Sequence, residues 1–109
     1  MGLLAKSLVA RTASPIAFVA GAVAGDEFVN TEKEYIVIKN TSSAAVTMTA
    51  DAEGEIDDLP VTDREVIIAG NTQQILGPWP KTVYNDADEH VNISYSLETY
   101  IEVGVMQIT

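Results

Sequence analysis

The residue types that most often catalyse reactions or bind metals are sparse in this sequence. It contains one histidine, His90, and no cysteine. One histidine cannot form a cage of several histidines around a metal, and as a catalytic base it needs an activated nucleophile beside it. No GxSxG, GxGxxG, P-loop or HExxH motif signals such a nucleophile or a cofactor site. We interpret His90 as the residue that opens the strand starting at Val91, and predict no enzymatic activity and no cofactor.

Carboxylates gather in two short stretches, residues 51–58 and 85–89. Hard cations such as Ca²⁺ bind several carboxylate oxygens on a flexible loop that contains a glycine, so residues 51–58 have the composition of a cation site. Their spacing differs from that of an EF-hand loop, which needs acids at fixed positions. We interpret both stretches as solvated loops between strands, and cation binding by residues 51–58 stays an open alternative.

Length and charge exclude several classes of protein. The 109 residues are enough for one domain with a real core. With 6 Lys+Arg against 16 Asp+Glu, the chain lacks the basic face that nucleic acids and bare membrane surfaces require. Because there is no cysteine to form a disulfide, stability must come from packing, oligomerisation or docking on a partner.

Residues 1–25 differ in charge from the rest of the chain. They hold Lys6 and Arg11 but none of the 16 acidic residues. Their basic start and apolar continuation resemble a secretory signal, but Arg11 and Pro15 interrupt the apolar stretch, which is also too short to span a membrane. We predict that residues 1–25 form an apolar docking arm and that residues 26–109 form the folded domain.

The rest of the chain consists of short β-type runs separated by turn residues. No segment after residue 25 shows a helical period over ten or more residues. Six or seven such strands exceed what one open sheet buries well, so we predict an all-β fold, an antiparallel two-sheet β-sandwich of jelly-roll or Ig-like Greek-key topology. The runs are residues 35–39, 46–50, 65–69, 72–76, 91–97 and 100–108.

The turns between these runs predict how neighbouring strands pair. Residues 35–39 and 46–50 are expected to form a hairpin, and residues 65–69 and 72–76 a second hairpin or a corner between sheets. Period-two alternation gives the predicted core. Its members are Tyr35, Val37, Val46, Met48, Val66, Ile68, Ile75, Val91, Ile93, Tyr95, Ile101, Val103 and Val105.

The single tryptophan, Trp79, lies between Pro78 and Pro80. The two prolines restrict the backbone on both sides of it, so its indole is carried on a stiff segment that is neither helix nor central strand. One interpretation is that the indole packs over Tyr84 and closes one end of the sandwich. The other is that it anchors an interface with a partner.

The second half of the sequence resembles a known family. Residues 69–86 read AGNTQQILGPWPKTVYND, and residues 91–96 read VNISYS. This pattern resembles small virion proteins of tailed bacteriophages, in which a Gly-Pro-aromatic-Pro turn and an aromatic-Asn-Asp turn recur. Two features depart from the family pattern: residues 86–90 lack a glycine, and residues 51–58 are unusually acidic.

The resemblance implies a capsid decoration, or cement, protein that binds the assembled phage head and bridges capsid subunits. The implied partner is the major capsid protein, with a homo-oligomer, a dimer or trimer, on the capsid surface of the virion and the protein in the host cytoplasm during assembly. Two alternatives are a carbohydrate- or Ca-binding β-sandwich module and a neck or tail component of the same virion. The expected partner-binding residues are Leu3, Leu4, Lys6, Leu8, Arg11, Ile16, Phe18, Trp79 and Tyr84.

Overall fold

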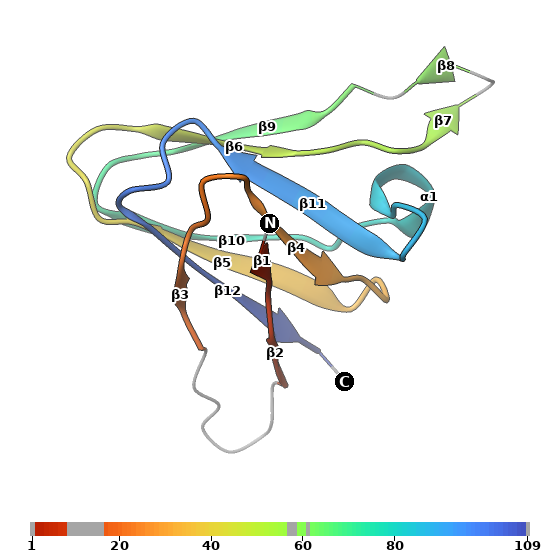
Figure 1. The fold of residues 1–109 in the computed structure, drawn as a ribbon, viewed down its shortest axis with the longest axis horizontal. Helices are drawn as coiled ribbons and strands as arrows, with labels where there is room; N and C mark the ends of the chain where they lie inside the picture. The colour runs from red at the N-terminus through yellow and green to blue at the C-terminus, as the bar shows by residue number, and fades with distance from the viewer. Residues whose placement is uncertain (1, 9–16, 57–58, 61, 109) are drawn as a thin grey trace.

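The computed structural model describes residues 2–8, 17–56, 59–60 and 62–108. Strands make up nearly all of its regular structure, and the one described helix, α1 (Lys81–Tyr84), is too short to cross a bilayer (Figure 1). The strands are β1 (Gly2–Leu3), β2 (Lys6–Leu8), β3 (Val19–Ala20), β4 (Asp26–Val29), β5 (Glu34–Asn40), β6 (Val46–Ala50), β7 (Glu55–Ile56), β8 (Leu59–Pro60), β9 (Arg64–Ile68), β10 (Thr72–Leu76), β11 (His90–Tyr95) and β12 (Ile101–Gln107).

Two five-stranded sheets pack face to face, which confirms the predicted β-sandwich. Sheet A has the order β1-β4-β11-β6-β9, and sheet B has the order β10-β5-β12-β2, with β3 also paired to β12. Most neighbours are antiparallel, as predicted, but β1 runs parallel to β4 and β2 runs parallel to β12. The strands β1 and β2 both belong to residues 2–8, so this N-terminal segment contributes an edge strand to each sheet.

The predicted hairpin of β5 and β6 is wrong, because the chain passes from sheet B to sheet A between these two strands. The side chain of Asn40 organises this crossing. Its Nδ2 donates to the carbonyl oxygens of Ala44 at 2.7 Å and Ile68 at 3.1 Å, and its Oδ1 accepts from the backbone N–H of Ser42 at 3.0 Å. These bonds hold the chain in a turn that leads away from β5, so β6 pairs with β9 and β11 instead.

The strands β9 and β10 form the predicted corner between sheets, because β9 belongs to sheet A and β10 to sheet B. The corner contains Asn71 with a positive φ of 57°. Asparagine tolerates this left-handed conformation better than most residues do. As a result, the two strands are edge strands on the same side of the sandwich.

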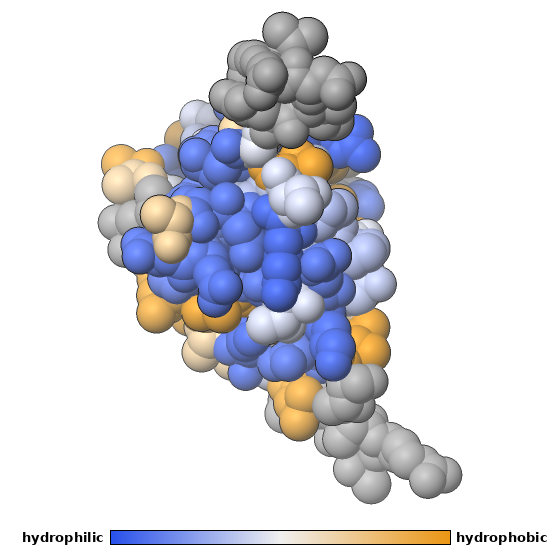
Figure 2. All heavy atoms as spheres, turned by 90° about the vertical axis from the view of Figure 1, so that its right-hand side faces the viewer, coloured by the Kyte–Doolittle hydropathy of each residue, from blue (hydrophilic) through white to orange (hydrophobic). Residues whose placement is uncertain are grey.

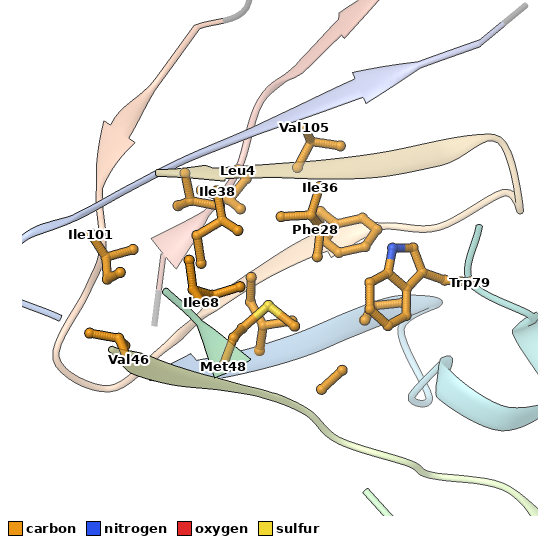
Figure 3. Close-up of a cluster of buried hydrophobic side chains, with 14 residues drawn as sticks. Leu4, Phe28, Ile36, Ile38, Val46, Met48, Ile68, Trp79, Ile101 and Val105 are labelled. Atoms are coloured by element: carbon orange, nitrogen blue, oxygen red, sulfur yellow. The ribbon is translucent and has the colours of Figure 1, made fainter. Parts of the chain in front are cut away.

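The core lies between the two sheets and draws on both of them (Figure 3). Two predicted core residues are wrong: Tyr35 is only half-buried and Ile75 is 57% exposed. The β5 run is apolar on both of its faces: Ile36 and Ile38 belong to the core cluster, and Val37 is fully buried as predicted but lies outside that cluster. The clustered core residues are Leu4, Phe28, Ile36, Ile38, Val46, Met48, Ala50, Ile68, Trp79, Val91, Ile93, Ile101, Val103 and Val105, with Val66 and Tyr95 packed against them.

Candidate partner-binding surfaces

The N-terminal segment, residues 2–8, closes one side of the sandwich. It runs beside β4 through β1 and then crosses to β12 through β2, with the side chain of Leu4 buried in the core at the crossing. The backbone N–H of Gly2 donates to the Gly25 carbonyl at 3.1 Å, and that of Leu4 donates to the Glu27 carbonyl at 2.8 Å. The division into an arm, residues 1–25, and a sandwich, residues 26–109, stays a prediction.

An ion pair fixes the second half of this segment. Lys6 Nζ lies 2.9 Å from Oε2 of Glu34, whose side chain has no exposed surface. The backbone N–H of Thr31 donates to Oε1 of the same carboxylate at 2.7 Å. Burial raises the pKa of Glu34, but the hydrogen bonds from Lys6 and Thr31 and the charge of Lys6 outweigh it, so the pKa lies below its usual value. Glu34 is therefore a buried, ionised anchor for β2.

Large apolar side chains are exposed along the described part of the predicted arm. The exposed fractions are 62% for Leu3, 57% for Leu8, 48% for Val19 and 86% for Val23. Figure 2 shows the side of the molecule that carries α1, where hydrophilic side chains cover most of the middle and hydrophobic ones lie at the margins. Leu3 and Leu8 make the N-terminal segment a candidate contact surface, since a partner can cover large apolar side chains that are exposed.

Of the other partner-binding residues predicted in the arm, the structure describes only Phe18. Phe18 is half-buried, and Lys39 Nζ lies 3.8 Å from the centroid of its ring. This is a cation–π contact within the chain, on the outer side of sheet B. Arg11 and Ile16 lie outside the described residues.

Trp79 closes one end of the core. Its side chain is 4% exposed, and its ring meets that of Tyr84 edge-on, with centroids 5.1 Å apart and planes at 88°. Figure 3 shows Trp79 at one end of the cluster, beyond Phe28 and Ile36. The structure therefore supports the packing interpretation of Trp79, because the side chain is almost fully buried and lies edge-on against Tyr84.

The turn that carries Trp79 is held by an asparagine that the sequence did not single out. Asn30 is buried after β4, and its Nδ2 donates to the Trp79 carbonyl and to Asn85 Oδ1, both at 2.7 Å. A buried amide that reaches two distant segments fixes their relative positions. The sequence gives no local signal for this role, because both partners lie about fifty positions away in the chain.

His90 and the acidic residues next to it form hydrogen bonds within a turn and with neighbouring strands. Asp86 Oδ2 accepts from Asn92 Nδ2 at 2.8 Å, and Asp86 Oδ1 accepts from the backbone N–H of His90 at 3.0 Å. These bonds, that from Asn92 above all, lower the pKa of Asp86. His90 Nδ1 lies 3.4 Å from Glu27 Oε2. In the described part of the chain, no three His, Asp or Glu side chains are grouped so as to hold a metal ion.

No protein-family model, curated protein or solved structure matches this chain.

Proposed function

We propose that this protein is a non-enzymatic virion structural protein of a tailed bacteriophage, a decoration or cement protein that binds the assembled head and bridges capsid subunits. Its partner is the major capsid protein, and its place is the capsid surface, where it forms a dimer or trimer. The Gly-Pro-Trp-Pro turn at residues 77–80 and the Tyr-Asn-Asp turn at residues 84–86 support this assignment through their resemblance to phage virion proteins.

The exposed apolar side chains of the N-terminal segment carry the proposal. Leu3 and Leu8 are each more than half exposed, although the chain has a net charge of −10. Fully burying an exposed leucine contributes about 1.5–3 kcal/mol, and more than half of the surface of Leu3 and of Leu8 is still exposed. A partner surface that covers both leucines would therefore add substantially to binding.

Binding of this kind stabilises a shell without any chemical step. A protein that binds the assembled shell and not its free subunits shifts the equilibrium toward the shell by mass action. Bridging two capsid subunits with one sandwich is sufficient for this effect. The proposal requires only a rigid body with a contact surface, which a two-sheet sandwich provides.

A carbohydrate-binding module is the less favoured alternative. Sugar-binding aromatic residues need an open ring face, but Trp79 is buried and Tyr84 packs against it. Tyr95 is half-buried, and its hydroxyl donates to Asp26 Oδ2 at 2.7 Å. A glycan array with and without a calcium chelator tests this alternative, and a neck or tail location is distinguished by a reconstruction of the particle.

The experiment that tests the proposal replaces exposed leucines with serine. The double variant Leu3→Ser, Leu8→Ser keeps Leu4 in the core, so it should fold normally. Its affinity for assembled shells should fall at least about tenfold, which corresponds to about 1.4 kcal/mol. A deletion of the segment is less informative, because it also removes Leu4 from the core.

The matched control changes exposed apolar residues elsewhere. Leu97 and Tyr100 are 45% and 53% exposed and lie between β11 and β12. The double variant Leu97→Ser, Tyr100→Ser should bind shells like the unmodified protein. Equal binding by both double variants would exclude the N-terminal segment as the contact surface.

A further inference from the structure

A groove of about 1080 Å³ opens between β9 and β10. Its apolar lining includes Val66, Leu76, Trp79, Val83 and Tyr84. It lies on the side of the sandwich opposite the N-terminal segment, because β9 and β10 are the far edge strands of sheets A and B. An opening with apolar side chains in its lining is a place where a partner can bury a side chain.

Both walls of the groove are strand edges. Within the described residues β9 pairs only with β6, and β10 pairs only with β5, so each has one edge without a neighbouring strand. A strand edge presents backbone N–H and C=O groups that an added extended segment can pair with. The groove therefore combines apolar walls with backbone hydrogen-bonding groups.

On the opposite side of the same sandwich, a segment of the chain itself binds to the edges of both sheets. There, residues 2–8 lie extended across both sheet edges and pair with β4 and then with β12. One large apolar side chain, that of Leu4, enters the core between the sheets. That segment carries a basic residue, Lys6, and no acidic residue.

The charges at the rim of the groove favour binding of a segment that carries basic side chains. Asp63 and Glu65 line it beside a single cation, Arg64, and both carboxylates are on exposed residues. Asp63 also lies close to Asp51, whose pKa is raised by burial and by the charge of Asp63. All 16 acidic residues of the chain lie in residues 26–109, so the surrounding field is negative as well.

We propose that the groove between β9 and β10 binds an extended apolar segment with basic side chains, contributed by a partner protein. The segment adds as a strand to one of the two edges, places apolar side chains against Val66 and Leu76, and sets its basic side chains against Asp63 and Glu65. This inference rests on the proposed docking function, because it names the chemistry of the partner segment that the protein recognises.

The test uses the full-length protein and the fluorescence of Trp79, which is the only tryptophan and lines the groove. Three synthetic eight-residue peptides with blocked ends are titrated: one alternating valine and lysine, one alternating valine and glutamate, and one alternating glycine and lysine. The valine–lysine peptide should change the fluorescence with saturation. The other two should not, because one lacks the positive charge and the other lacks the apolar side chains.

A pair of charge reversals locates the binding site. Glu65→Lys alters the rim of the groove, whereas Glu102→Lys makes the same change of charge at an exposed position of β12. We expect Glu65→Lys to weaken binding of the valine–lysine peptide about tenfold and Glu102→Lys to leave it nearly unchanged. Equal effects of the two variants, or no saturable signal with the unmodified protein, would overturn the inference.

Shell binding by the same variants separates this inference from the proposed function. If the unmodified protein binds assembled shells while Glu65→Lys binds them equally well and the peptides do not bind, the groove inference is wrong and the docking function stands. If the unmodified protein does not bind shells, the docking function itself fails. The expected result is weaker shell binding by Glu65→Lys than by Glu102→Lys.

Discussion

Lys6 Nζ and Glu34 Oε2 lie 2.9 Å apart and connect the N-terminal segment to the first residue of β5. The carboxylate is fully buried and also accepts hydrogen bonds from the backbone and hydroxyl of Thr31. A buried charge with this many donors is stabilising only while it stays ionised. The N-terminal segment is therefore attached to the sandwich by a contact that depends on pH.

The first prediction concerns acid stability. The folded pKa of Glu34 is below its ordinary value of 4.5, so its contribution to stability is fully present above that pH and is lost as the pH falls through the folded pKa. Glu34→Gln should lower the free energy of unfolding by about 1–3 kcal/mol at neutral pH. This difference should shrink as the pH falls below 4.5, measured by urea denaturation across pH.

The control for that experiment is Glu102→Gln, which removes a carboxylate from an exposed position of β12. Its free energy of unfolding should stay within about 0.5 kcal/mol of that of the unmodified protein. A Glu34→Gln effect that is the same at pH 7 and in acid would show that the ionised pair does not stabilise the fold.

The second prediction concerns Trp79 as the closure of the core. Trp79→Ala should lower the free energy of unfolding by about 3–5 kcal/mol, because it removes a buried aromatic side chain and leaves a cavity. Denaturant unfolding followed by circular dichroism measures this effect. A loss below about 1 kcal/mol, together with reduced shell binding, would instead support the interface interpretation of Trp79.

The third prediction concerns Gly77, which precedes Pro78 in the turn that carries Trp79. Its φ is +145°, and a Cβ there would lie 2.9 Å from Tyr35 Cδ2 and 3.0 Å from the Glu34 carbonyl oxygen. Gly77→Ala should therefore destabilise the fold by more than about 1 kcal/mol. Thermal unfolding checks this, and an unchanged melting temperature would contradict the geometry of the turn.

The fourth prediction concerns salt. A net charge of −10 on 109 residues produces mutual repulsion, and the chain has no disulfide to oppose it. The melting temperature of the isolated protein should rise with ionic strength, because salt screens exposed charges. A melting temperature that does not change between low and high salt would show that the repulsion is not a significant term.

The sequence predicted the two-sheet fold because most strands show their alternation locally. In β5 it was wrong for Tyr35 and missed Ile36 and Ile38, because residues 35–38 are all apolar and the alternation alone does not say which pair faces the other sheet. The buried polar residues Glu34 and Asn40, in phase with Ile36 and Ile38, mark the inner face, but only their partners in the fold reveal why they are buried.

The candidate surfaces were less predictable than the fold. The sequence indicated that residues 1–25 are unusually apolar, yet it contains no signal that Leu4 enters the core or that β1 and β2 pair in parallel with distant strands. The groove between β9 and β10 also depends on long-range geometry, since it forms only because the corner at residues 69–71 places the two strands in different sheets.

The most direct test of the central claim is sedimentation of the purified protein with shells assembled from the major capsid protein of the same phage, beside the unassembled capsid subunits. The proposal predicts saturable binding to the shells at a fixed ratio, no binding to the free subunits, and a higher temperature of shell disassembly in the presence of the protein. Absence of binding to assembled shells, or equal binding to shells and free subunits, would contradict it.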